Sequence, residues 1–449
     1  MATVSVSVSL AHYEEALEAA AQVAVRRWAA ADPPVPLDGL PGGAGGRVNE
    51  EEFKVPAGPR DLGRTGAGAR LPKATGGPPQ VRMTWSDSRQ TSSDASRIVA
   101  VMETAQPPVA PAASAGGNPL GVTAAPFIRS GTAAVIDLAR RAGRLGYDSF
   151  WVAEVTGIEA FSVLGAASSA APGVGLGTGV LAMQVRTPPL LAMAAASLQA
   201  LAPDREVLLG VGVSSPVVAR DWHGASYPAS PLAHMREFIV LLRECLSGDT
   251  VTFAGDYYQV RKFRLGVEPG ERKPKIVLGA LGEGMLRLAG QEADGVLLNY
   301  LPASHVSWCV EQVRRGGNAT IYANIHVGVG DREAAAPRAR YDLFSYAVVD
   351  AYANSFTRAG YGDAIQAIRA AHRAGDRAGA LAAVPDEMVD AIDVVGDETL
   401  VRETISAYRH AGVDVPVVFP LTWGAAGQDA LESTLRAAIT RPTTAAHGI

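Results

Sequence analysis

The sequence predicts an α/β fold: a TIM (β/α)8 barrel with a hairpin or loop insertion after the fourth helix, preceded by a mostly disordered N-terminal leader. From Pro119 to about Thr422, short apolar runs alternate with segments of helical periodicity. The apolar runs are almost unbroken, as in parallel strands that are buried on both faces. The alternative, an open doubly wound sheet, is disfavoured because Gly210-Val-Gly212 lacks the third glycine of the dinucleotide fingerprint and is followed by Pro216.

Two regions differ in composition. Residues 1–117 hold 12 of the 29 prolines and include linker-like Pro/Gly/Ala stretches. Only Ala11–Ala31 has the pattern of a helix there, with acids first and arginines last. We therefore expect a low-complexity or disordered leader over 1–117 and a barrel over 118–449, with a real accessory segment as the alternative for the leader.

The strands and helices of the barrel follow in order. Gly146 is placed to end the first helix in the left-handed conformation, and Pro188 fits the first turn of the third. A hairpin at 250–265 interrupts the alternation after the fourth helix, and the last strand has no predicted helix after it. Strands are expected at 119–124, 148–154, 174–182, 206–213, 275–281, 294–301, 320–330 and 414–422; helices are expected at 131–146, 160–171, 188–202, 231–248, 283–293 and 305–317, and over a long stretch from Pro337 to Ala411.

In a TIM barrel the functional groups lie at the carboxyl ends of the strands. Glu154 ends the second strand, where a buried carboxylate acts as a general acid or base; it can equally cap a loop or pair with Arg186. On the loop after the fourth strand, His223 can hydrogen-bond to a ligand, and Trp222 beside it can cover a flat ring. Glu154 and His223 are the candidate catalytic residues.

Two glycine-rich turns are candidate binding sites. The fourth strand ends in Gly212-Val213-Ser214, where the glycine lets a ligand approach the backbone, although a tight turn chosen for packing has the same pattern. The fifth strand ends in Gly279-Ala280-Leu281-Gly282-Glu283-Gly284-Met285, at the start of a helix. Free amides at a helix N-terminus attract phosphate, so this turn is either a phosphate site or a plain glycine-rich turn.

Other classes of function lack support. The formal net charge of −5 and the absence of a basic stripe argue against nucleic acid as a partner. No apolar run reaches the length of a membrane span, and the N-terminus does not read as a signal peptide. Two cysteines fit a reducing cytoplasm, and no His, Cys or carboxylate group has the spacing of a metal site.

Several ordered motifs carry a family resemblance. "GYDSFWVAE", "RDWHGASY" and "IVLGALGEGMLRLAGQEADGVLLNYL" resemble the bacterial-luciferase-like superfamily of oxidoreductases, and within it the branch that uses the deazaflavin coenzyme F-420. The resemblance spans Pro119 to about Thr422 and implies a homodimer of TIM barrels acting on a small organic substrate. It also implies that an 8-hydroxy-5-deazaflavin, or FMN in the alternative, lies across the barrel mouth.

The resemblance assigns roles to the turns. It implies a non-proline cis peptide near Thr178-Gly179-Val180, a lining role for Gly212-Val213-Ser214, and coenzyme phosphate at Ala280 to Met285. Many relatives carry histidine where this chain has Glu154. The expected activity is hydride transfer between the coenzyme and an unidentified substrate. The alternatives are an FMN-dependent monooxygenase and a catalytically silent barrel that binds a coenzyme or a partner.

Overall fold

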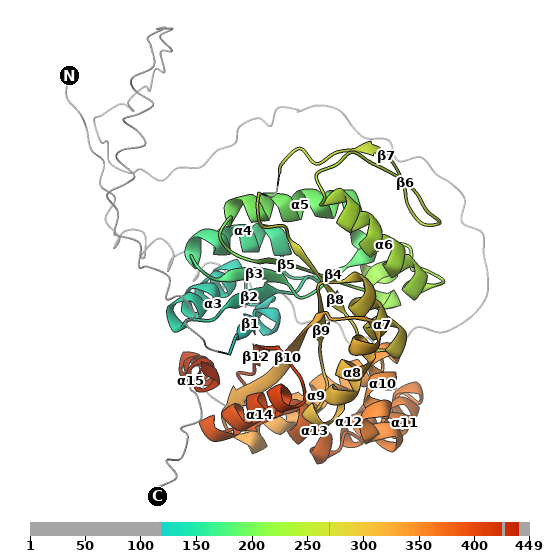
Figure 1. Cartoon of the computed structure of the whole chain (residues 1–449). Coiled ribbons are helices and arrows are strands. Elements are labelled where there is room, and N and C mark those ends of the chain that lie inside the picture. The colour runs from blue at the N-terminus through green and yellow to red at the C-terminus, as the bar shows by residue number, and fades with distance from the viewer. Residues whose placement is uncertain (1–117, 269, 424–426, 440–449) are drawn as a thin grey trace, which may run out of the picture. The chain divides into compact units, whose positions relative to one another are not determined.

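The structure is a computed structural model that describes residues 118–268, 270–423 and 427–439 (Figure 1). The predicted leader, with its possible helix at Ala11–Ala31, lies outside these residues. Among the described helices, none combines the length and the apolar character that a membrane crossing requires.

The strands close into a parallel barrel. Each strand pairs in parallel with its neighbours, and β12 closes the ring because it pairs with both β10 and β1. The predicted TIM barrel is confirmed. The barrel strands are β1 (Gly121–Thr123), β2 (Ser149–Val152), β3 (Gly175–Thr178), β5 (Val207–Gly212), β8 (Lys275–Gly279), β9 (Gly295–Leu298), β10 (Thr320–Val329) and β12 (Val415–Pro420).

Helices surround the strands, and their ends follow local sequence signals. Gly146 ends α3 with φ of 82°, a left-handed conformation that glycine adopts without strain. Thr187 caps α5 ahead of Pro188, its side chain accepting the Leu190 amide at 3.4 Å. The outer helices are α3 (Thr132–Leu145), α4 (Ala160–Ala170), α5 (Pro188–Leu201), α6 (Pro231–Cys245), α7 (Glu283–Glu292), α8 (Ala303–Gly316), α14 (Glu398–His410) and α15 (Gly427–Ile439).

The barrel interior is filled around one tryptophan. Trp151 is fully buried, and its indole N–H donates to Ser149 Oγ at 2.9 Å. Its ring lies over Gly177, its partner in the β2–β3 register, where an added Cβ would lie 2.5 Å from the ring. The remaining inward side chains form a compact apolar cluster with it: Leu208, Val277, Leu297, Tyr322 and Val417.

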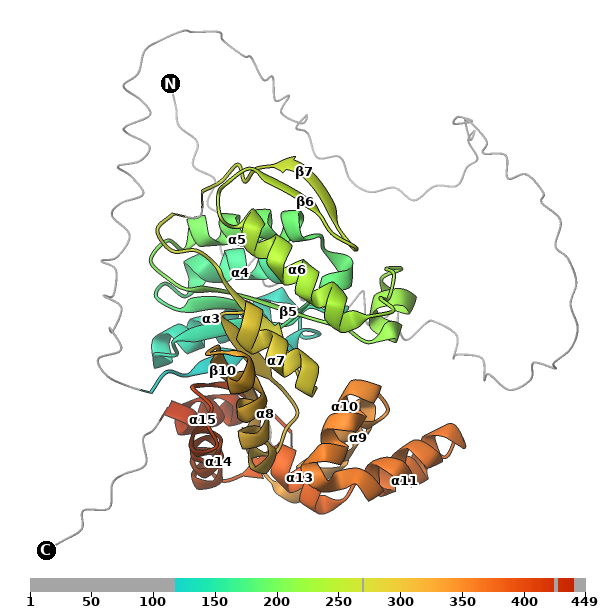
Figure 2. The same cartoon turned by 45° about the vertical axis from the view of Figure 1, so that its right-hand side comes forward.

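The insertion after the fourth helix is a hairpin, as predicted. Strands β6 (Val251–Ala254) and β7 (Gln259–Phe263) pair antiparallel next to α6 (Figures 1 and 2). Glu237 of α6 holds the turn of the hairpin, because its carboxylate accepts three successive backbone amides at 2.7–2.8 Å: Asp256, Tyr257 and Tyr258.

Three of the predictions on elements were wrong. The stretch Pro337–Ala411 is not wholly helical: it contains β11 (Asp393–Gly396), which pairs with the end of β10 beyond the point where β9 stops. Its two central residues are β-branched valines that pack against the barrel, so tertiary pairing decides this strand. The helices of the stretch gather on one side of the barrel (Figure 2): α9 (Arg332–Ala347), α10 (Asp350–Phe356), α11 (Gly362–Arg373), α12 (Arg377–Ala382) and α13 (Asp386–Ile392).

The last strand is also followed by a helix, contrary to the prediction. Helix α15 packs on α14 and α3. Thr434 in α15 accepts the Val329 amide at 2.8 Å, and Tyr147 donates its hydroxyl to the Leu435 carbonyl at 3.0 Å. Long-range hydrogen bonds of this kind, to residues far away in sequence, leave no local pattern. The predicted third strand is divided as well, into β3 and the short β4 (Leu181–Ala182).

Candidate functional site

A cis peptide bond joins Gly179 to Val180 between β3 and β4, at the carboxyl end of the barrel. This matches the expectation drawn from the family resemblance. The Val180 side chain lies against two glycines: a Cβ added at Gly212 would be 2.9 Å from it, and one added at Gly279 would be 3.2 Å from it. These glycines therefore have a packing role at the barrel mouth, whatever ligand they face.

Gly210 has an equally clear packing role. A Cβ there would lie 1.8 Å from the Thr178 carbonyl oxygen, and Thr178 Oγ1 donates to the Gly210 carbonyl at 2.9 Å. The Gly-x-Gly pattern of β5 is thus required by the close approach of β3. The structure supports the packing alternative for this pattern without testing whether the turn also lines a ligand.

The turn after β5 presents polar groups. The Ser214 amide donates to Gln184 Oε1 at 3.5 Å, and Ser215 Oγ accepts the Val218 amide at 3.2 Å. The nitrogen of the same side-chain amide, Gln184 Nε2, is buried and has no hydrogen-bond partner among the described residues. A buried donor without an acceptor is costly, so a ligand with an acceptor oxygen or nitrogen fits beside Ser214.

The glycine-rich turn lies at the start of α7, as predicted. Gly282 is the N-cap residue, and no side chain accepts the amides of the first turn. A Cβ added at Gly282 would have no neighbour within 4 Å, so the space beside the N-cap is open, whereas one at Gly284 would lie 3.1 Å from the Leu232 side chain. Glu283 forms an ion pair with Arg287 on the same helix, and its side chain is more than half exposed. This turn has the free amides and the access that a phosphate group requires.

Arg358 brings a positive charge to this turn from a distant part of the chain. Its Nη2 donates to the Leu281 carbonyl at 3.0 Å, and its guanidinium lies 5.3 Å from the centre of the Trp308 ring. In the described part of the chain it has no carboxylate partner. No sequence motif indicates Arg358, because it lies 77 residues from Leu281.

Glu154 lies two residues beyond β2 and is held from two sides. Arg186 Nη2 donates to its Oε2 at 2.9 Å and to its Oε1 at 3.1 Å, and the Ala160 amide donates to Oε2 at 2.9 Å. These donors engage both carboxylate oxygens as acceptors. Burial opposes the charge of Arg186, yet the bonds to Glu154 and Glu159 raise its pKa overall. The geometry favours a positioning role for Glu154 over proton donation.

His223 lies on the exposed loop that follows β5. Its Nε2 donates to the Val155 carbonyl at 2.6 Å and so connects this loop to the loop after β2. The neighbouring Trp222 is about half exposed, as a ring available to cover a flat ligand would be. The catalytic role of His223 stays a prediction, since its one observed bond is to the backbone.

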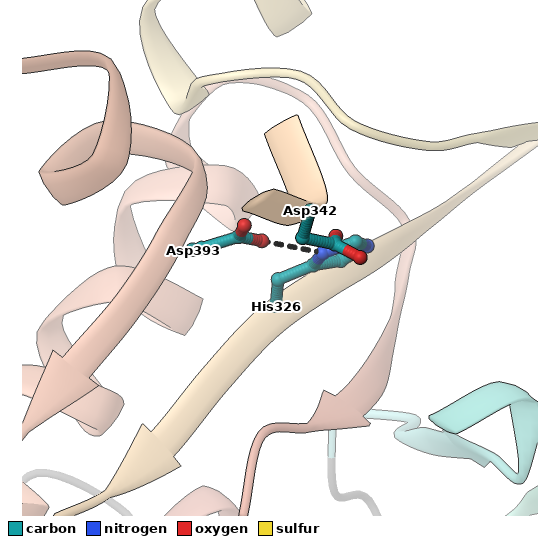
Figure 3. A group of neighbouring side chains, drawn as sticks. All are labelled: His326, Asp342 and Asp393. Carbon is teal, nitrogen blue, oxygen red and sulfur yellow. Dashed lines mark hydrogen bonds and ion pairs between the residues drawn. The ribbon is translucent and has the colours of Figure 1, made fainter. Parts of the chain in front are cut away.

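Sequence reasoning missed a buried cluster at the ends of β9 and β10. His326 of β10, Asp393 of β11 and Asp342 of α9 point toward one another (Figure 3), with His326 Nδ1 2.9 Å from Asp393 Oδ1. Desolvation lowers the pKa of His326 to about 4. Burial raises the pKa of Asp342 to about 6 and that of Asp393 well above its usual range. The three residues are 16 and 51 positions apart, so no spacing motif could have found them.

The chain matches one protein family over residues 112–415, the luciferase-like monooxygenases. A protein of Mycobacterium tuberculosis that bears the name "putative coenzyme F420-dependent oxidoreductase" is 30% identical over 311 residues, which are 63% of this chain and 89% of the relative. The 5,10-methylenetetrahydromethanopterin reductase of Archaeoglobus fulgidus is 27% identical, over 60% of this chain and 83% of its own.

Solved structures show the same fold. The coenzyme F-420-dependent tetrahydromethanopterin reductase of Methanopyrus kandleri superposes with a TM-score of 0.57 at 19% identity, over 71% of this chain and 96% of that one. An FMN complex of the oxygenating constituent of 3,6-diketocamphane monooxygenase from Pseudomonas putida gives a TM-score of 0.52 at 16% identity, over 72% of this chain and 96% of that one.

Proposed function

Because this chain belongs to the luciferase-like monooxygenase family, we propose that it is a coenzyme F-420-dependent oxidoreductase that transfers a hydride between the deazaflavin and a small organic substrate. The observation that carries the proposal is the uncapped N-terminus of α7 at the barrel mouth, together with a relative named for this coenzyme. The substrate is unidentified, and we expect a homodimer in the cytoplasm, as the sequence suggests.

The described residues fit an anionic, ring-bearing coenzyme. The amides of Gly282 to Met285 would hold its phosphate, and Arg358 adds a positive charge next to them. The orphaned Nε2 of Gln184 would donate to an acceptor atom of the ring, beside the turn Gly212-Val213-Ser214. Thr178-Gly179-Val180 would support the ring from the barrel side.

When bound, the coenzyme supplies the hydride donor or acceptor. The protein binds it, orients it and excludes water. Glu154 and Arg186 fix the loop after β2 at the mouth through their paired bonds. His223 closes the gap between the loops that follow β2 and β5. We place Glu154 in a positioning role and keep His223 as the candidate group for proton transfer to the substrate.

The test is a pair of fluorescence titrations, with coenzyme F-420 and with FMN, on the same preparation. We expect F-420 to bind at least tenfold more tightly, which corresponds to about 1.4 kcal/mol. Tighter binding of FMN would favour the monooxygenase alternative, which the FMN complex of a solved structure with this fold makes worth testing. Binding of neither compound would leave a catalytically silent barrel as the better description.

A further inference from the structure

The buried cluster has the composition of a metal site. It offers one imidazole nitrogen and two carboxylate oxygens, from His326, Asp342 and Asp393, and these atoms lie within 4.8 Å of one another (Figure 3). The three ligands come from β10, α9 and β11, so they are fixed by different elements rather than by one flexible loop. The side chains of His326 and Asp393 are almost completely buried.

The outer atoms of His326 and Asp342 are already engaged in hydrogen bonds to neighbouring side chains. His326 Nε2 donates to Asn299 Oδ1 at 3.0 Å, since an amide oxygen only accepts. Nδ1 of a neutral imidazole then carries a lone pair, and it accepts the proton of Asp393 Oδ1 at 2.9 Å, in agreement with the burial that raises the pKa of Asp393. Tyr300 donates its hydroxyl to Asp342 Oδ2 at 2.7 Å. Metal sites show this pattern, in which partners outside the site orient the ligating atoms.

Packing fixes the plane of the imidazole. The ring of His326 stacks on Phe419 with 3.9 Å between centroids, and the ring of Tyr300 meets it edge-on at 4.2 Å. Rotation of the imidazole away from the carboxylates would break both ring contacts and the bond to Asn299. The nitrogen is therefore held toward the centre of the cluster.

The two carboxylates need either protons or a cation to neutralise them. No Lys or Arg of the described residues forms an ion pair with Asp342 or Asp393. Asp393 Oδ2 is buried and has no hydrogen-bond partner in the structure. Two ionised carboxylates in a site of low dielectric are unfavourable, so either protons bind to them or a cation neutralises them. A divalent ion would neutralise both and would satisfy the orphaned oxygen.

We propose that His326, Asp342 and Asp393 bind one divalent first-row transition metal ion of the Zn²⁺ type. An imidazole with two carboxylates suits such an ion, whereas Mg²⁺ and Ca²⁺ prefer oxygen ligands alone. Around tetrahedral zinc, with bonds of about 2.0–2.1 Å, ligand atoms lie roughly 3.3 Å apart. Because His326 and Asp393 are already 2.9 Å apart, Asp342 is the ligand that must move inward, by up to about 1.5 Å.

The position of the site indicates a structural role for the ion. Its ligands connect the barrel strand β10 to β11 and α9, which begin and end the helical stretch on one side of the barrel. Because His326 and Asp393 are closed to solvent, a substrate cannot reach the metal. A bound ion would thus fasten this stretch to the barrel mouth and would not take part in hydride transfer.

The test loads the full-length protein with ZnCl2, removes free ion by gel filtration and measures metal content. We expect about one ion per wild-type chain and at least a tenfold weaker affinity for Asp393→Asn and Asp342→Asn. The matched control is Asp363→Asn, an exposed carboxylate of α11, which should retain wild-type metal content. Zinc at a hundredfold excess over Kd should raise the thermal midpoint of the wild type by roughly 3–5 °C.

A second measurement uses the wild type alone, so its result does not depend on whether the variants fold. Wild-type protein loaded with Co²⁺ should show the strong visible absorption of a tetrahedral site, and a chelator should remove the colour and the gain in thermal midpoint together. The proposal is overturned if the wild type holds no more metal than Asp342→Asn, or if added Zn²⁺ leaves its thermal midpoint unchanged. Either result would mean that protons alone neutralise the cluster.

Discussion

The N-cap of α7 allows a test in which stability and coenzyme affinity change in opposite directions. Gly282 has φ of −97° and ψ of 152°, an extended conformation that any residue adopts, and a side chain there meets open space. Gly282→Asp would supply the missing cap, as Asp331 does for α9 by accepting the Ala334 amide at 2.9 Å. We therefore expect the free protein to gain about 0.5–1 kcal/mol from the cap and the helix dipole.

The same carboxylate would occupy the position proposed for the coenzyme phosphate. Two unit negative charges about 5 Å apart repel by roughly 0.8 kcal/mol in water and by about 3 kcal/mol at an effective dielectric constant of 20. The affinity for coenzyme F-420 should therefore fall between about fourfold and 200-fold. Gly282→Asn is the matched control, because it has nearly the same shape and capping ability without the charge.

The assay is a fluorescence titration of the wild type and both variants at low and high salt, with thermal unfolding of the free proteins alongside. The Asp variant should bind more weakly than the Asn variant, and salt should narrow the gap between them because it screens exposed charges. If Gly282→Asp unfolds at the wild-type temperature or above and still binds the coenzyme as tightly as the wild type, the phosphate does not bind at α7. The turn at Gly212–Ser215 would then be the next site to test.

Three further predictions concern single side chains. Arg358→Gln should weaken F-420 binding about two- to fivefold at low salt and less at high salt, because the guanidinium is exposed and salt screens its charge. An equal loss of affinity at both salt concentrations would contradict an electrostatic role. Glu154→Gln should keep coenzyme affinity within about twofold and lower turnover, since the hydrogen bonds that hold Arg186 are weakened. Unchanged turnover with an identified substrate would show that Glu154 has a purely structural role. Gly177→Ala should lower the free energy of unfolding in urea by about 1–3 kcal/mol, because its Cβ would overlap the Trp151 ring. Gly282→Ala, whose Cβ lies in open space, should lower the free energy of unfolding by less, and equal losses in the two variants would refute the packing argument.

The sequence by itself determined the barrel and the position of its mouth. Unbroken apolar runs alternating with helical segments require strands covered on both faces, and that pattern is local enough to read along the chain. The C-cap at Gly146 and the glycine turn at Gly282 were predictable for the same reason, since each depends on a few adjacent residues. The cis peptide at Gly179 was expected only through family resemblance.

Only the tertiary structure decided which distant side chains meet. Val394 and Val395 form a strand because the end of β10 offers an unpaired edge, and no periodicity within 337–411 reveals that edge. The pairing of Glu154 with Arg186, the approach of Arg358 to Leu281, and the cluster of His326 with two aspartates depend on strands and helices brought together by barrel closure. Such contacts carry no sequence spacing, because the distance along the chain between partners is set by the loops and not by the chemistry of the site.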